Sequence, residues 1–228
     1  MDRSFDANSI AEMALQLHDE PGTVETVERV CQYALKAIDC DYAGIIFLHK
    51  KNSRIETIAA TNPLVEKLDR IQLDIGEGPD VEALHDRLSL IVPDTTLERR
   101  WPRWAGTVAA AGIRSLLNVR LHTSQEVLGT LNLYSTTPDK FDIEDQAVAH
   151  VIARHAAVAI AAARKEENLW QAVDARKVIG QAQGILMERY DLDADKAFEV
   201  LVRYSQQNNT KLHDIAELLV STRKLDNS

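Results

Sequence analysis

Apolar residues recur at helical spacing near the start of the chain, in two segments separated by Pro21-Gly22. Residues three and four apart share one face of a helix, so the spacing predicts amphipathic helices over residues 10–17 and 24–38. Thr23 is expected to cap the second helix, because a threonine hydroxyl can accept a hydrogen bond from a free amide of the first turn.

Short runs rich in β-branched and aromatic residues follow, separated by turn residues, and they are typical of strands. Strands and helices are not in strict alternation, which predicts an α+β domain with an antiparallel sheet flanked by helices. Strands are expected at 42–48, 54–59, 89–93, 115–121 and 127–134, with a turn at 50–53 and short helices at 62–71 and 105–111.

The segment from Ile143 to Tyr190 contains no proline, and its apolar residues keep a loose three-and-four spacing. This predicts one long helix, which cannot bury its whole apolar stripe within one small domain. Two interpretations stay open for residues 143–178. The helix can be the last helix of the sheet domain, packed on the sheet over its first third, or it can continue as a two-chain coiled coil.

Three apolar stripes at helical spacing close the chain and can form a small core of their own. Asp193 and Thr210 are the expected caps of the second and third helices. Gly180 and Gly184 lower helix propensity, which favours close approach of a neighbouring helix or of a ligand backbone, with simple packing as the alternative. The stripes contain Ile179, Ala182, Ile185, Leu186 and Tyr190, then Ala197, Phe198, Val200, Leu201 and Tyr204, then Leu212, Ile215, Ala216 and Leu219.

The length of 228 residues is consistent with two folded units, and the composition is that of a globular protein. The mean hydropathy of -0.22 and the lack of an 18-residue apolar run predict no membrane-spanning segment. The first twenty residues lack the features of a secretory signal, so we expect a cytoplasmic protein.

The net charge of -9 argues against attraction of nucleic acid by the overall field of the protein. Residues 169–228 hold 8 basic and 9 acidic side chains, so the remaining -8 falls on the first 168 residues. Cys31 and Cys40 are too few for a disulfide scaffold, and they belong to no Cys/His cluster that could bind a metal. We therefore expect no metal and no cofactor.

The first 165 residues resemble the GAF family of small-molecule sensor domains. The resemblance covers about residues 8 to 165, and it implies a ligand pocket bordered by Gly76, Gly78, Asp80, Trp101 and Trp104, although large aromatic residues such as these two tryptophans are more often core residues. Related GAF domains often have Cys where this chain has Asp80, which speaks against a redox or covalent-cofactor role there. The motifs are Gly76-Glu77-Gly78-Pro79, Arg100-Trp101-Pro102, Gly112-Ile113-Arg114-Ser115-Leu116-Leu117, Leu128-Gly129-Thr130-Leu131-Asn132-Leu133-Tyr134 and Phe141-Asp142-Ile143-Glu144-Asp145.

Residues 170–228 resemble the ANTAR domain, a three-helix RNA-binding module of bacterial antiterminators, on the string Ile179 to Tyr190. The resemblance implies a regulator that binds paired stem-loops in nascent mRNA and controls termination. Its GAF domain would sense a small ligand or a partner, and the protein would be a homodimer. RNA loops are recognised by cations, planar groups and amides. The expected RNA-binding residues are Arg176, Lys177, Gln183, Arg203, Tyr204, Ser205, Gln206, Asn208, Asn209 and Lys211, of which Gln183 replaces a frequent Lys of the family.

Three other functions are weighed. A DNA-binding factor with a GAF sensor is one, although no helix dense in Arg or Lys is present. A GAF-type small-molecule reductase is another, but Cys31 lies in a helical stripe and Cys40 at its end. A phosphoacceptor receiver would need an acidic pair after the first strand, whereas Asp39 and Asp41 precede one. The expectation is a protein without catalytic residues.

Overall fold

The computed structural model describes residues 7–49, 54–83 and 88–223, and it divides into two compact units, Met1–Arg164 and Lys165–Ser228. The turn expected at 50–53 lies outside the described residues.

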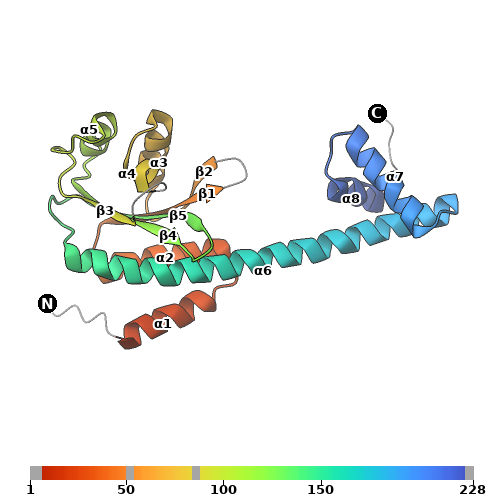
Figure 1. The fold of residues 1–228 in the computed structure, drawn as a ribbon, viewed down its shortest axis with the longest axis horizontal. Helices are drawn as coiled ribbons and strands as arrows, with labels where there is room; N and C mark the ends of the chain where they lie inside the picture. Colours follow the sequence, from red (N-terminus) through yellow and green to blue (C-terminus); the bar gives the residue numbers. More distant parts are fainter. Residues whose placement is uncertain (1–6, 50–53, 84–87, 224–228) are drawn as a thin grey trace. The chain divides into compact units, whose positions relative to one another are not determined.

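The first unit is built on a five-stranded antiparallel sheet in the order β2-β1-β5-β4-β3 (Figure 1). The expected α+β class and the positions of the strands are confirmed, with each strand ending one residue away from its predicted end. The strands are β1 (Tyr42–His49), β2 (Arg54–Ala60), β3 (Ser89–Val92), β4 (Ser115–His122) and β5 (Val127–Ser135).

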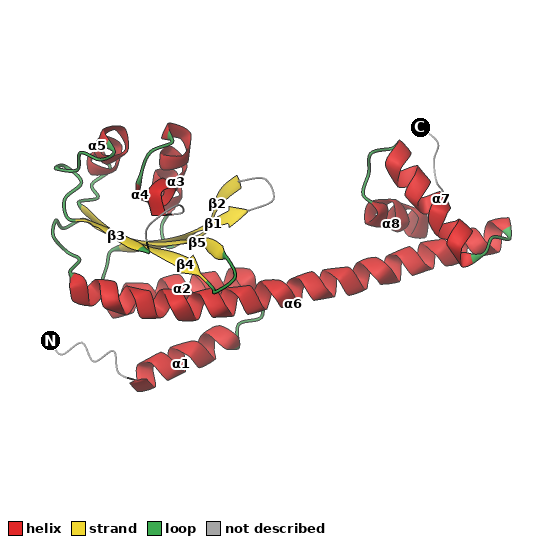
Figure 2. Cartoon of the chain, in the orientation of Figure 1, coloured by secondary structure: helices red, strands yellow, loops and turns green. Residues whose placement is uncertain are grey.

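Helices cover both faces of this sheet (Figure 2). Successive side chains of a strand point to opposite faces, so β4 sends Leu117 and Val119 into one core and Leu116 into another. The first core also takes α1 (Ala7–His18), α2 (Thr23–Ile38) and the start of α6 (Ile143–Tyr190), and the second takes α3 (Pro63–Ile75) and α5 (Pro102–Ala110). The short helix α4 (Pro79–Ala83) contacts β4 on the second face.

Helices α2 and α3 begin in different ways. Asn62 caps α3, because its side chain accepts a hydrogen bond from the amide of Leu64 at 2.9 Å. The cap expected at Thr23 is wrong. The extended residue before α2 is Gly22, and Thr23 is already the first helical residue.

Helix α6 confirms the expected long helix, with 48 residues from Ile143 to Tyr190. It also corrects the expectation about membranes, because it is long and apolar enough, by length and composition, to cross one. In the structure its residues Ala149, Ile152 and Ala156 are fully buried against the sheet domain. A core helix passes the same test, so this single helix is weak support for a membrane span.

The second unit contains the last turns of α6 with α7 (Ala194–Gln207) and α8 (Leu212–Thr222), an all-α three-helix domain. The predicted stripes form its core, but Tyr190 and Phe198 are 60% and 41% exposed and do not belong to the buried set. The fully buried core residues are Ala182, Leu186, Ala197, Leu201, Ile215, Ala216 and Leu219.

Two local expectations in this unit have opposite outcomes. Asp193 caps α7, since its side chain accepts from the amide of Lys196 at 2.8 Å. The cap of α8 is Lys211 and not Thr210, whose hydroxyl instead donates to the carbonyl of Asn208 at 3.1 Å.

Candidate functional site

The turn between α7 and α8 gathers seven of the ten residues expected to bind RNA. Asn209 adopts a left-handed conformation with φ of 49°, which turns the chain sharply. The Ser205 hydroxyl donates to the carbonyl of Thr210 at 2.6 Å, and the Asn208 amide donates to the carbonyl of Tyr204 at 2.9 Å. These side chains are therefore engaged in holding the turn.

Asn208 is exposed although it holds the turn, and the other exposed side chains among these seven are Arg203, Gln206, Asn209 and Lys211. Tyr204 is half-buried and packs against the three-helix core. The turn thus presents two cations and two amides on a backbone that is fixed by its own hydrogen bonds. These groups can contact phosphates and base edges, and because the turn is already ordered, binding loses less conformational entropy than it would with a flexible loop.

A second group lies on α6. Arg176 and Lys177 are exposed, whereas the Gln183 amide donates to the carbonyl of Ala194 at 3.1 Å and so joins α6 to the start of α7. Helix α7 has 14 residues, which places its two ends roughly 20 Å apart. Gln183 therefore lies far from the turn, and the ten residues form two groups.

The glycines between these residues have open surroundings. A Cβ atom added to Gly180 or Gly184 would meet no described atom within 4 Å beyond its own helix. Within the described part of this chain, no neighbouring helix approaches these glycines, so that expectation is wrong. The alternative that they are packing glycines is wrong for the same reason.

On the sensor unit, Gly76 and Gly78 shape the link between α3 and α4. Gly76 ends α3 with φ of 73°, and its amide donates to the carbonyl of Gln72. Gly78 has φ of 146°, and a Cβ there would overlap the side chain of Gln72. Both positions require glycine for conformational reasons.

Asp80 follows this link and is fully buried on the sheet. Its carboxylate accepts hydrogen bonds from Asn118 Nδ2 and Thr130 Oγ1, both at 2.6 Å, and from Asn132 Nδ2 at 2.9 Å. The side chain of Gln72 donates to the same carboxylate, and the amide of Asp80 donates back to Gln72 Oε1 at 2.9 Å. Asp80 therefore fastens α4 to strands β4 and β5.

A second buried carboxyl lies close by. Asp69 on α3 accepts from Tyr134 Oη at 2.8 Å and from Thr57 Oγ1 at 3.0 Å. Burial raises the pKa of both Asp69 and Asp80, and the charge of Asp80 raises that of Asp69 further. The hydrogen-bond partners of both carboxyls among the described residues are neutral, so two negative charges at this place are unfavourable.

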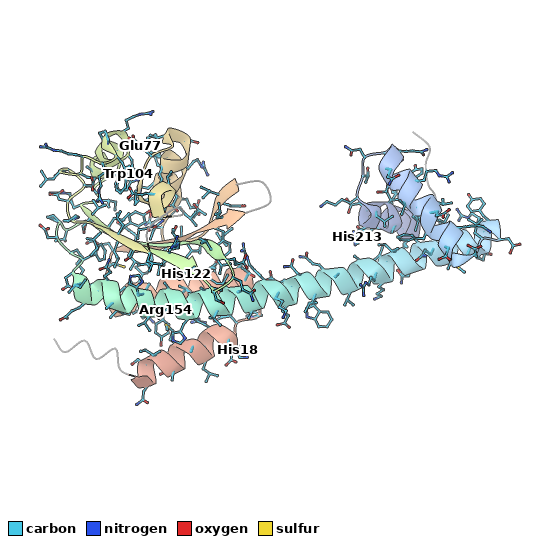
Figure 3. The ribbon with its side chains drawn as sticks, in the orientation of Figure 1. His18, Glu77, Trp104, His122, Arg154 and His213 are labelled. Atoms are coloured by element: carbon cyan, nitrogen blue, oxygen red, sulfur yellow. The ribbon has the colours of Figure 1, made fainter. Side chains whose placement is uncertain are left out.

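Trp101 and Trp104 lie in the core of the same face, 7% and 1% exposed, with ring centroids 5.7 Å apart in an edge-to-face arrangement. Glu77 holds this segment from a distance along the chain. Its carboxylate accepts from the amides of Arg103 at 2.7 Å and Trp104 at 3.1 Å, where α5 begins (Figure 3). The two tryptophans are thus buried core residues, as in the second of the two interpretations given for them.

Sequence reasoning missed the polar cluster under Asp80. Asn118 on β4, and Thr130, Asn132 and Tyr134 on β5, recur at every second position among buried residues. A strand side chain at every second position points to the same face, so this period-two polar pattern was the signal that could have revealed the cluster. One atom of it, Asn118 Oδ1, is buried without a described hydrogen-bond partner.

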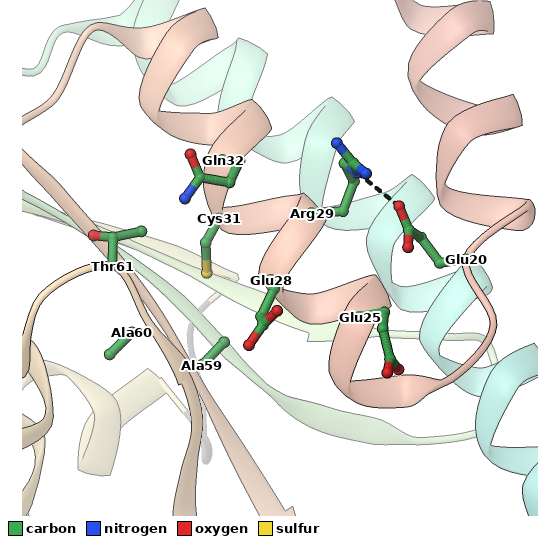
Figure 4. Close-up of a pocket in the computed structure, with 9 residues that line it drawn as sticks. All are labelled: Glu20, Glu25, Glu28, Arg29, Cys31, Gln32, Ala59, Ala60 and Thr61. Atoms are coloured by element: carbon green, nitrogen blue, oxygen red, sulfur yellow. Dashed lines mark hydrogen bonds and ion pairs between the residues drawn. The ribbon is translucent and has the colours of Figure 1, made fainter.

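A separate hollow of about 440 Å³ lies between α2 and β2 (Figure 4). Its wall on α2 carries Glu25, Glu28 and Cys31, and its wall on β2 carries Ala59 and Ala60. Cys31 and Cys40 lack the lowered pKa of a reactive thiol. Burial raises the pKa of both Cys31 and Cys40 to about 12, so neither is a thiolate at neutral pH.

Comparison with known families agrees with this architecture. The model of the GAF domain family matches residues 22–161, more than half of the chain, and that of the ANTAR domain matches residues 167–220. The chain therefore belongs to the GAF domain family and carries an ANTAR domain behind the GAF domain. Both are regulatory domains. No curated protein matches the chain.

Solved structures share the fold at low identity. The GAF domain of a phosphoenolpyruvate-protein phosphotransferase from Coxiella burnetii is 16% identical with a TM-score of 0.60, and the match covers 74% of this chain and 99% of that one. A free methionine-R-sulfoxide reductase from Neisseria meningitidis is also 16% identical, with a TM-score of 0.56 and coverage of 69% and 89%. At these identities the similarity concerns the fold alone.

Proposed function

We propose that this protein is a cytoplasmic regulator that binds paired stem-loops in nascent mRNA through its ANTAR domain and thereby controls transcription termination. The observation that carries this proposal is the ANTAR match at residues 167–220, on a three-helix unit whose α7–α8 turn presents Arg203, Gln206, Asn209 and Lys211 at the surface. Its GAF domain senses a small ligand or a partner protein. No step of this function requires catalysis.

The same proposal includes a homodimer. Helix α6 exposes Leu169, Trp170 and Val173 by 54% to 63%, a group of large apolar side chains that favours a partner helix. A coiled coil over the part of residues 143–178 that lies beyond the sheet domain would place two ANTAR domains on one particle. Two binding modules on one particle make the second hairpin contact intramolecular, which raises avidity without new contacts.

Binding of the full chain to four labelled probes tests the proposal. The probes are an RNA with two hairpins, the same RNA with one hairpin unfolded by mutation, a single-stranded RNA and a duplex DNA of equal length. We expect the two-hairpin RNA to bind most tightly, with a shallow dependence on salt because few cations are available. Equal affinity for the duplex DNA at physiological salt would favour the DNA-binding alternative and refute the proposal.

Matched variants locate the surface. Arg203→Ala and Lys211→Ala should each weaken RNA binding, while Arg154→Ala, which removes an exposed charge from the sensor unit, should not. If all three variants weaken binding alike, the effect comes from net charge and the turn is not the contact surface.

A further inference from the structure

We propose that the hollow between α2 and β2 binds an alkyl ammonium group, as found on a small aliphatic amine or on a lysine side chain. This site is independent of the polar cluster under Asp80 and of the RNA-binding surface. It lies wholly within the sensor unit, on residues 20–61.

The hollow has the size and the fixed walls of a binding pocket. The hollow has a volume of about 440 Å³, within the range of small-molecule pockets. Its walls come from elements that the core holds in place, because Val27, Val30 and Ala34 of α2 are fully buried beside it. The concave surface therefore exists before any ligand binds.

The lining of the hollow carries an excess of negative charge. Three carboxylates line the hollow, and the one cation among the lining residues, Arg29, pairs with Glu20 at 2.6 Å. Glu25 and Glu28 form no ion pair with another described residue, and both lie one turn apart on α2. Figure 4 shows Glu28 pointing from α2 toward the strand, across the space that a ligand would occupy.

The floor of the hollow is apolar. Cys31 is 1% exposed, has no hydrogen-bond partner among the described residues, and points from α2 toward Ala59 and Ala60 (Figure 4). Because burial raises its pKa to about 12, it is a neutral thiol that adds no charge. The floor is thus made of two methyl groups and a thiol, which suits an aliphatic chain, below a rim of carboxylates that suits an ammonium group.

Two probes test the proposal on the full chain and separate the two sources of the ligand. One is 1,5-diaminopentane, and the other is a short lysine-containing peptide with blocked ends. Titration calorimetry should show one saturable site for at least one of them at concentrations up to about 10 mM. Binding of the free diamine identifies a small amine as the source, and binding of the peptide alone identifies a basic segment of a partner protein.

The double variant Glu25→Gln/Glu28→Gln should weaken binding by about fivefold or more, because it removes both unpaired carboxylates. The control Glu144→Gln/Glu188→Gln makes the same change in net charge at exposed positions of α6 and should bind as the wild type does. Circular dichroism checks that each variant is folded. Absence of saturable binding of both probes, or equal weakening in the two double variants, overturns the proposal.

Discussion

Replacing Leu201 by Ala should unfold the ANTAR unit at markedly lower temperature or urea concentration than in the wild type. Leu201 is fully buried at the centre of the three-helix core. Removing three carbon atoms costs about 2.4 kcal/mol at 0.8 kcal/mol per buried methylene, and the cavity that remains brings the total to about 2 to 5 kcal/mol. A unit of this size has a stability of only about 3 to 10 kcal/mol, so the loss is a large fraction of the whole.

Urea unfolding of the full chain, followed by far-UV circular dichroism, measures this effect. Because the two units are compact on their own, we expect an additional early transition for residues 165–228 while the sensor unit unfolds as before. Arg203→Ala is the matched control, two residues further along α7 and exposed, and it should change the free energy of unfolding by less than about 0.5 kcal/mol. A Leu201 variant as stable as the wild type, or an Arg203 variant that loses as much, would refute the assigned core.

Three further predictions concern the sensor unit and its helix. Burial raises the pKa of Asp69, so the folded protein keeps the proton on this carboxyl. The stability that the protonated Asp69 contributes is therefore lost as the pH rises above the ordinary Asp value near 4. In urea unfolding, Asp69→Asn should be more stable than the wild type at pH 8 and equally stable at pH 4, and a difference that does not change with pH would contradict this. Glu77→Ala should destabilise the sensor unit by about 1 kcal/mol because it removes the acceptor of two α5 amides, and Glu77→Gln, which keeps an acceptor, should lose less in the same thermal melt. Inserting two residues beside Lys165 turns the following part of α6 by about 200°, so affinity for a two-hairpin RNA should fall while circular dichroism stays unchanged; unaltered binding would show that the helix is a passive tether.

The sequence predicted much of this fold because the spacing of apolar residues and the residues that start or end a helix are local properties of the chain. The long helix was readable from the absence of proline between Ile143 and Tyr190, and the cap at Asp193 from one side chain next to a helix start. Thr210 failed as a cap because a hydroxyl can also donate to a nearby carbonyl, here that of Asn208, and both choices look alike in sequence.

The sites were harder to predict because they depend on residues distant in sequence. Asp80 receives hydrogen bonds from Asn118 and Asn132, 38 and 52 positions away, and only the pairing of β4 with β5 brings these together. Similarly, Glu77 reaches the start of α5 across 26 positions. The hollow beside Cys31 needs α2 and the end of β2 on either side of it, which no local pattern indicates.

Helix α6 and the sensor face, which carries Asp80, lie on opposite sides of the sheet, so under the proposed function an effect of a ligand would reach α6 through the strands. Asp69, Asp80 and the two tryptophans lie on one face, and the buried stripe of α6 lies on the other. Helix α6 is joined to that sheet beyond its apolar stripe. The Ser89 hydroxyl of β3 is 2.8 Å from His150 Nε2, and the guanidinium of Arg164 lies 4.0 Å from the ring centre of Phe47 on β1. A ligand on the sensor face can influence α6 only if it favours one arrangement of these strands over another, since a ligand shifts an equilibrium by its difference in affinity for the two states. Polar contacts that join the strands to both layers, such as those of Asp80 and Ser89, are therefore the positions at which substitutions should alter signalling without contacting RNA.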